Sequence, residues 1–195
     1  MKVEACKPPH AMSSRCWALC IGMNDYVNVT PLSGCINDAQ DVGALLKTHG
    51  FEVKVLRNAS GEEAHDEVES LIARCGEADR VVVMLSGHGG QYENDSYLFP
   101  VDFGTMKRNG VLRDTHRDAL AIHGDVVTRL QGKNKKGLNV VITDMCRSST
   151  RFRDQPTTRG GEENVAVRRN DQPRGTLVAY ACEQGHTSLD TGRNG

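Results

Sequence analysis

Short runs of apolar residues alternate along the chain with longer segments in which apolar positions recur every three or four residues. The apolar runs predict strands at 16–21, 51–56, 81–85, 138–142 and 176–180. The periodic segments predict helices from Asn37 or Asp38 to Thr48, from Ser60 to Cys75 and over 114–131, and residues 97–101 predict a short hairpin arm. Strands that alternate with helices form βαβ units. We therefore expect an α/β fold, a three-layer sandwich whose mainly parallel sheet is flanked by helices on both faces.

Residues 147–174 break this alternation. The segment contains two prolines, a Gly-Gly pair and few large apolar residues, together with seven arginines at positions 147, 151, 153, 159, 168, 169 and 174. Compact domains contain loops of this length when the loop is functional or mobile. We predict a loose leader at 1–14 and one domain at 15–195 that includes this basic loop. No closing helix or strand is predicted before Gly195, so we expect the domain to continue beyond that residue.

Composition narrows the class of protein only a little. The 195 residues are 38% hydrophobic and 25% charged, as in an ordinary soluble domain. Lysine and arginine number 24 and aspartate and glutamate 25, a balance that gives no support for a nucleic-acid partner or an anionic membrane surface. No apolar run approaches the roughly 18 residues of a membrane-spanning helix. Seven cysteines without a C-x-x-C pair, and no apolar signal segment near the start, predict reduced thiols and a cytoplasmic location.

Two reactive side chains follow predicted buried strands. His88 lies just beyond the strand at 81–85, and Cys146 lies just beyond the strand at 138–142. Because the carboxyl ends of parallel strands meet at one edge of a sheet, we expect the imidazole and the thiol to lie close together. A thiol with a pKa near ~8.5 is mostly protonated at neutral pH, and a neighbouring imidazole activates it as a nucleophile. The alternatives are a small buried cysteine and a histidine that serves only in a turn.

Two backbone groups near these residues suit acyl transfer, and a nearby carboxylate suits substrate binding. The backbone N–H groups of Gly89 and Cys146 are candidate donors to an oxyanion. Asp144 precedes Cys146 by two positions in an extended segment, so both side chains are expected on one side. A carboxylate next to a thiolate raises the pKa of the thiol, and Asp144 therefore suits a pocket that binds a cation better than it suits activation of the thiol. The alternative for Asp144 is a helix cap or a solvated loop residue.

The sequence lacks the motifs of two other protein classes, the cysteine phosphatases and the dinucleotide-binding folds. A cysteine phosphatase requires an arginine six positions after its cysteine, and that position is Phe152. A dinucleotide-binding fold requires G-x-G-x-x-G after its first strand, and the chain has Gly-Met-Asn-Asp at 22–25.

Several segments taken together resemble the caspase-like cysteine peptidases, most closely the paracaspase and metacaspase branch. The segments that carry the resemblance are WALCIGMNDY at 17–26, LSGCIND at 32–38, SGHGG at 86–90, FPVD at 99–102, DMCR at 144–147 and AYAC at 179–182. They occur in the family's order from about residue 15 to the end of the chain. The interval between His88 and Cys146 is also typical of caspases.

The resemblance implies a cysteine endopeptidase with the caspase fold and a His88–Cys146 dyad, in which Gly89 and Cys146 form the oxyanion hole. It also implies an acidic pocket, built from Asp38, Asp144 and Asp190, that selects arginine or lysine immediately before the cut. Carboxylates bind a planar guanidinium through paired hydrogen bonds, which agrees with that selectivity. The alternative for Asp38 is capping of the helix that begins near it.

The resemblance has consequences for partners and cofactors as well. It implies peptide substrates with arginine or lysine at the cut, and the arginines of 147–174 then suggest self-cleavage in that loop or occlusion of the site by it. The alternative is a solvated basic loop. The segment 91–95 is less acidic than the matching segment of calcium-dependent metacaspases, so we expect neither a Ca²⁺ requirement nor another cofactor or metal. Dimer pairing in this family uses elements beyond the equivalent of Gly195. The alternative function, from a different class, is a caspase-fold interaction module without turnover.

Overall fold

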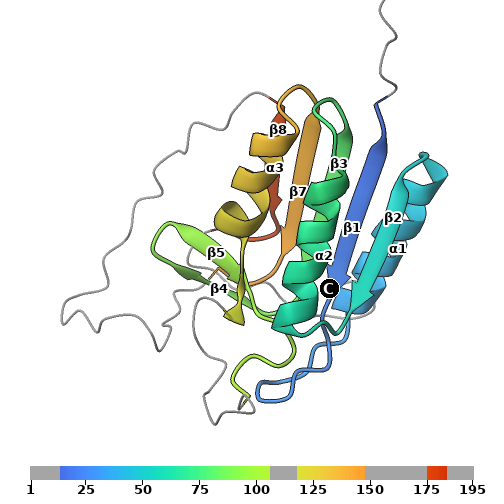
Figure 1. Cartoon of the computed structure of the whole chain (residues 1–195). Coiled ribbons are helices and arrows are strands. Elements are labelled where there is room, and N and C mark those ends of the chain that lie inside the picture. Colours follow the sequence, from blue (N-terminus) through green and yellow to red (C-terminus); the bar gives the residue numbers. More distant parts are fainter. Residues whose placement is uncertain (1–13, 106–117, 148–174, 184–195) are drawn as a thin grey trace, which may run out of the picture.

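The central element of the fold is a parallel sheet, shown in Figure 1. The computed structural model describes residues 14–105, 118–147 and 175–183. Five strands are ordered β2-β1-β3-β7-β8, and every neighbouring pair is parallel. They are β1 (Cys16–Gly22), β2 (Glu52–Arg57), β3 (Arg80–Ser86), β7 (Leu138–Asp144) and β8 (Thr176–Tyr180). The prediction of a mainly parallel sheet is confirmed, and the observed strand ends differ from the predicted ones by at most two residues.

Helices cover both faces of this sheet (Figure 1). On one face, α1 (Cys35–Thr48) packs Ala39, Val42 and Leu46 against Cys20 and Met84 of the sheet. The opposite face carries α2 (Gly61–Arg74), the π-helical turn η2 (Ile122–Val127) and α3 (Thr128–Lys133). Successive side chains of a strand point to opposite faces. This alternation is why β1 contributes Cys20 to one core cluster and its two neighbours to the other.

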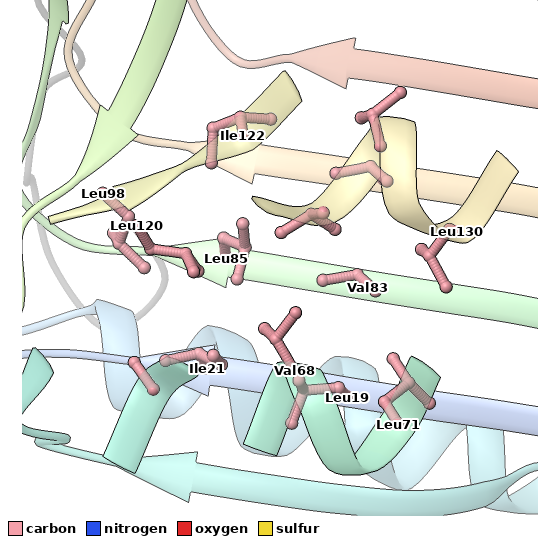
Figure 2. Close-up of a cluster of buried hydrophobic side chains, with 14 of the residues drawn as sticks. Leu19, Ile21, Val68, Leu71, Val83, Leu85, Leu98, Leu120, Ile122 and Leu130 are labelled. Carbon is pink, nitrogen blue, oxygen red and sulfur yellow. The ribbon is translucent and has the colours of Figure 1, made fainter. Parts of the chain in front are cut away.

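Figure 2 shows the larger core cluster, in which aliphatic side chains of the sheet meet those of the covering helices. Leu19 and Ile21 of β1 and Val83 and Leu85 of β3 are all 0 or 1% exposed. Across from them lie apolar residues of the covering elements, namely Val68, Leu71, Ile122 and Leu130. Each such side chain contributes roughly 1.5–3 kcal/mol when it is fully removed from water. The sheet therefore forms a rigid base for the loops at its carboxyl edge.

A small antiparallel sheet follows β3 directly. Its strands are β4 (Gly89–Tyr92), β5 (Asp95–Leu98) and β6 (Leu120–Ala121), in that order. The predicted hairpin arm at 97–101 overlaps β5, but the strand lies earlier, at 95–98. The hairpin begins one residue after His88, so its pairing bears on the position of that imidazole.

The predicted helix over 114–131 is only partly correct. Residues 106–117 lie outside the described ranges, and Leu120 and Ala121 pair with β5 instead of forming a helical turn. The helical segment begins at Ile122, because the Asp95 carboxylate accepts hydrogen bonds from the N–H groups of His123 (2.8 Å) and Gly124 (2.9 Å). Asp95 comes from β5, and a periodicity argument has no access to a contact of this range.

The starts of α1 and α2 differ in how they are capped. Ser60 forms a capping box with Glu63, as expected for α2. The expectation that Asn37 or Asp38 caps α1 is wrong: the helix begins at Cys35 after Gly34 and has no side-chain cap. Asp38 lies in the first turn instead, where its carboxylate accepts a hydrogen bond from Oγ of Ser86 at 3.3 Å. Within the described ranges, every helix is too short or too polar to cross a bilayer.

Candidate active site

The register of the sheet brings the two reactive residues to one edge. Ser86 ends β3, Asp144 ends β7, and the two are partners in the parallel ladder. His88 and Cys146 each follow two positions later, on neighbouring strands. The N–H of Gly87 donates to the carbonyl of Asp144 at 3.1 Å, which continues the pairing one step beyond the strands. Both side chains are partly exposed, as a site open to substrate requires.

Contacts from the segment after β1 surround His88. Nε2 of the imidazole lies 2.8 Å from the carbonyl oxygen of Thr30, and a carbonyl can only accept, so Nε2 carries the proton. In the neutral imidazole this leaves Nδ1 as the nitrogen that accepts a proton. The backbone N–H of His88 donates to the hydroxyl of Tyr26 at 2.7 Å, and the two rings lie 4.6 Å apart at 60°.

The segment 23–34, which provides Tyr26 and Thr30, is held by two asparagines. Oδ1 of Asn58 accepts from the N–H groups of Asn24 (2.8 Å) and Asp25 (3.0 Å). Asn24 in turn donates from its side chain to the carbonyl of Ser33 and accepts from the N–H of Ile36. Asn58 has a φ of 49°, a left-handed conformation that asparagine adopts more readily than most residues. These bonds fix the loop that holds the imidazole.

The segment after β7 is fixed from the neighbouring strand. Met145 is buried in the core, whereas Asp144 and Cys146 on either side of it are partly exposed. The thiol of Cys182, just beyond β8, donates to the carbonyl of Met145 at 3.3 Å. Burial raises the pKa of that thiol, against the effect of the Arg147 N–H that donates to it. Cys182 therefore binds the backbone on both sides of Cys146.

Arg147 extends this support. Its guanidinium carbon lies 3.8 Å from the centre of the Tyr180 ring, and the Tyr180 hydroxyl lies 3.0 Å from Nε2 of His123. A cation over an aromatic face is an attractive arrangement. The residue that follows the candidate nucleophile is thus tied to β8 and, through Tyr180, to η2.

Gly89, the candidate oxyanion donor, follows His88 directly and begins β4. The N–H of Phe99 donates to the carbonyl of His88 at 2.8 Å, which makes these two a hydrogen-bonded pair of the antiparallel ladder. Such pairs alternate with pairs that exchange no hydrogen bonds, so the N–H of Gly89, opposite Leu98, points away from β5. A Cβ at Gly89 would lie 2.7 Å from Sδ of Met145 and 2.8 Å from the carbonyl oxygen of Tyr97. Only glycine fits there.

A pocket of about 440 Å³ opens beside the end of β7, between α1 and the sheet. Three carboxylates line it, from Asp38, Asp41 and Asp144. Its remaining lining is mainly apolar, from Val42, Met84, Ile142, Thr143, Ala179, Tyr180 and Ala181. Two residues of the predicted acidic set thus meet in one pocket, while Asp190 lies outside the described ranges.

Asp41 was not predicted from the sequence. It follows Asp38 by three positions, and residues at that spacing share one face of a helix. The helical spacing alone was therefore the signal that could have placed Asp41 at the pocket.

The described residues contain neither a metal-binding cluster nor a disulfide. Among the residues that the structure describes, no group of three or more histidine, cysteine, aspartate or glutamate side chains is arranged to hold a metal ion. The six described cysteines form no disulfide with one another. The basic loop at 147–174, apart from Arg147, lies outside the described ranges.

Sequence and structure comparisons identify the family. A caspase-domain family model matches residues 15–195, and the chain therefore belongs to the caspase-domain peptidase family. Metacaspase-1A of Neurospora crassa is 31% identical over 160 residues, which cover 71% of this chain and 33% of that protein. The human mucosa-associated lymphoid tissue lymphoma translocation protein 1 is 24% identical over 137 residues, or 70% of this chain and 16% of that protein. The resemblance to the metacaspase and paracaspase branch is confirmed.

A solved structure supports the fold independently. Caspase-1 from Spodoptera frugiperda matches with a TM-score of 0.60 over 93% of this chain and 64% of that chain, at 14% identity. A likeness at this identity concerns the fold alone, and it confirms the caspase-like sandwich. The chain spans a third or less of the two protein relatives, so the activity of the whole protein belongs to the proposal that follows.

Proposed function

We propose that this chain is a cysteine endopeptidase that cleaves after arginine, and less readily after lysine, with His88 and Cys146 as its catalytic dyad. The observation that carries the proposal is the ladder pairing of Ser86 with Asp144, since each of these residues lies two positions before a member of the dyad. The contact between Nε2 of His88 and the Thr30 carbonyl supports it, because that contact leaves Nδ1 as the base.

The proposed reaction follows the usual course of acyl transfer to a thiol. Nδ1 of His88 takes the proton of the Cys146 thiol, and the thiolate forms a bond to the carbonyl carbon of the scissile peptide. The electron pair of the carbonyl moves to oxygen, which accepts hydrogen bonds from the N–H groups of Gly89 and Cys146. The C–N bond then breaks as the imidazolium protonates the leaving amine. His88 finally deprotonates a water that attacks the thioester and releases Cys146.

The acidic pocket provides the proposed selectivity. Asp38 and Asp144 supply carboxylates for a guanidinium or ammonium group, and the apolar side chains of Met84 and Ile142 suit its aliphatic stem. Arginine is preferred because its planar head donates to two oxygens at once. Asp190 belongs to the proposed acidic set by family resemblance alone.

A panel of fluorogenic peptides with arginine, lysine, aspartate or leucine at the cut position tests this function. We expect turnover in the order arginine, lysine, then little for the other two, and none with Cys146→Ala. Cleavage after aspartate would overturn the pocket assignment and keep the dyad. Two results together would instead favour the non-catalytic interaction module. These are no turnover of any peptide, and a Cys146 that reacts with a covalent thiol probe no faster in wild type than in His88→Ala.

Asp144→Asn tests the pocket itself. Loss of one carboxylate that pairs with a largely desolvated cation should lower kcat/KM for the arginine peptide by roughly 10- to 100-fold. The matched control is Asp66→Asn, which removes the same charge from α2 on the opposite face of the sheet and should leave the rate unchanged. Equal losses in the two variants would mean that general charge, not the pocket, attracts the substrate.

The remaining parts of the proposal concern Ca²⁺ and self-cleavage. We expect equal rates in a calcium chelator and in added Ca²⁺, because the segment 91–95 is less acidic than the matching segment of calcium-dependent metacaspases. We also expect the arginines of 147–174 to be cut by the enzyme itself. Mass spectrometry of purified wild type and Cys146→Ala tests this, and a loop that stays intact in wild-type protein able to cleave the arginine peptide would contradict it.

A further inference from the structure

The antiparallel ladder is interrupted at the candidate catalytic histidine. His88 directly precedes β4 and Phe99 directly follows β5, so the two residues form the next pair beyond these strands. The N–H of Phe99 donates to the carbonyl of His88 at 2.8 Å. A hydrogen-bonded antiparallel pair normally exchanges two such bonds. Here the hydroxyl of Tyr26 replaces the second one: it accepts from the N–H of His88 at 2.7 Å and donates to the carbonyl of Phe99 at 3.0 Å.

The inserted hydroxyl is held firmly in place. Tyr26 is only 5% exposed, and it packs in the main core cluster. Its burial raises the pKa of the phenol, so the hydroxyl stays protonated and remains a donor to Phe99. A Cβ at Gly87 would lie 2.6 Å from the Tyr26 oxygen, so the glycine before His88 makes room for this hydroxyl. The ring of Tyr26 lies 4.6 Å from that of His88.

We infer that Tyr26 is a positioning residue for catalysis: its hydroxyl keeps the strands apart at His88 and thereby sets the direction in which the imidazole leaves the backbone. The inference rests on the proposed function, in which Nδ1 of His88 must reach the Cys146 thiol. A catalytic group that is displaced by about 1 Å loses on the order of 100-fold in rate. Without the hydroxyl, the N–H of His88 and the carbonyl of Phe99 are free to approach each other, and this closure rotates the peptide that carries the imidazole.

Tyr26→Phe tests the inference, because it removes the hydroxyl and keeps the ring. We expect kcat for the arginine peptide to fall roughly 10- to 100-fold with KM nearly unchanged, since the pocket is untouched. The matched control is Tyr97→Phe, which removes the phenol oxygen of another buried tyrosine, in β5 of the same hairpin. We expect the control to retain kcat and to unfold in urea at a midpoint similar to that of Tyr26→Phe. Unchanged kcat in Tyr26→Phe, or equal losses in both variants, would overturn the inference.

A measurement that needs no turnover separates this inference from the proposed function. The imidazole resonances of His88, assigned by comparison with His88→Gln, should shift in Tyr26→Phe and stay in place in Tyr97→Phe. If the wild type cleaves none of the peptides but these resonances still shift, the proposed function fails, while the control of the imidazole's orientation by the Tyr26 hydroxyl stands. Resonances that are the same in Tyr26→Phe and wild type would overturn the positioning role even in an active enzyme.

A second variant guards against a general loss of structure. Gly87→Ala introduces a Cβ whose closest contact is the Tyr26 oxygen, with Leu98 next at 3.1 Å. We expect it to lower kcat strongly in wild type and less in Tyr26→Phe, where that contact is absent. Such non-additivity is the signature of two residues that act through one contact. Additive losses would mean that Tyr26 and Gly87 act separately and would contradict the inference.

Discussion

Ser86 and Asp144 are ladder partners at the ends of β3 and β7, and this pairing fixes the separation of the two loops that carry the proposed dyad. β3 is the central strand of the sheet and β7 is its neighbour. Met84 of β3 and Val141 of β7 are both buried, on opposite faces of the sheet. A slip of one residue would turn every side chain of β7 to the opposite face. The relative placement of imidazole and thiol is therefore set by the core packing of the sheet.

Gly89→Ala should abolish most of the proposed peptidase activity. The new Cβ meets the Tyr97 carbonyl at 2.8 Å, a backbone atom that cannot rotate away, so the N–H of residue 89 must move. Loss of one oxyanion donor costs on the order of 10²- to 10³-fold in kcat. The control is Gly132→Ala, where nothing lies within 4 Å of the added Cβ, and a helical alanine there should be neutral or stabilising by up to about 1 kcal/mol. Steady-state kinetics on both variants checks the prediction, and an active Gly89→Ala enzyme would contradict it.

Alkylation of the folded protein should discriminate among the cysteines. Burial raises the pKa of both the Cys20 and the Cys75 thiols to about 11. At pH 7.5 less than about one molecule in a thousand then carries a thiolate at either position, and the thiolate is the reactive form. Cys146 is partly exposed and follows the strand that pairs with the one leading to His88, so limited iodoacetamide followed by mass spectrometry should label it first. Labelling of Cys20 or Cys75 at the rate of Cys146 would contradict the prediction.

Asp79→Ala should destabilise the fold far from the site. This carboxylate is buried and accepts hydrogen bonds from the N–H groups of Arg15 (3.0 Å) and Gly76 (2.8 Å) and from Nε1 of Trp17 (2.8 Å). Donors left without an acceptor in the interior cost about 1–3 kcal/mol each, so we expect a loss of roughly 2–5 kcal/mol in the free energy of unfolding. Urea denaturation measures it. The control is Glu77→Ala, an exposed residue paired with Lys136, whose unfolding midpoint should match that of wild type.

The same carboxylate predicts an acid dependence of stability. Burial by itself raises the pKa of Asp79, but the hydrogen bonds from Gly76, Arg15 and Trp17 outweigh it and hold the pKa below its ordinary value. Its contribution is present above the unfolded pKa of about 3.9 and is lost as the pH falls through the lower folded value. Asp79→Asn should therefore flatten the stability curve below pH 4, and a variant as acid-sensitive as wild type would argue against this role.

His65 predicts the opposite dependence near neutral pH. The Asp125 carboxylate, 3.5 Å from Nε2, raises the pKa of this imidazole, and Nδ1 also lies 2.7 Å from the Gly61 carbonyl. The protonated form then favours the folded state: its contribution is complete below the unfolded pKa of about 6.5 and disappears as the pH rises through the higher folded value. Both side chains are about one-third exposed, so the effect is no more than about 1 kcal/mol.

His65→Gln checks this prediction. The variant should lose stability at pH 6 and match wild type above pH 8, whereas His49→Gln, at the exposed end of α1, should follow the wild-type curve. Stability profiles that are parallel for wild type and His65→Gln would show that the pair with Asp125 contributes nothing.

Much of the architecture could be predicted from the sequence, because its signals are local. Five apolar runs form the five parallel strands, and the Ser60 capping box marks the start of α2. Parallel connectivity is then sufficient to place His88 and Cys146 at one edge of the sheet. The errors arose where a distant side chain overrides local preference: Asp95 sets the start of η2, and Ser86 engages Asp38 where a helix cap was expected.

The contacts that position the site residues could not be predicted from the sequence, because they join residues that are far apart in the chain. The Tyr26 hydroxyl enters a ladder between residues more than sixty positions away in the chain, and no periodicity records that contact. The contacts of the Cys182 thiol with the backbone around Cys146 likewise depend on the pairing of β7 with β8. Asp41 differs, since its helical spacing from Asp38 was visible in the sequence.

The hydrogen bonds of the Asn58 side chain suggest a way to influence His88 from a distance. It lies just beyond β2, at the edge of the sheet, yet its amide holds Asn24 and Asp25 at the start of the segment that surrounds His88. In the proposed peptidase, a small molecule that competes for those two N–H groups would loosen the segment that contacts His88 at a point outside the acidic pocket. Replacement of Asn58 would act on the same segment, and in the proposed peptidase it would lower the rate without altering a residue of the pocket.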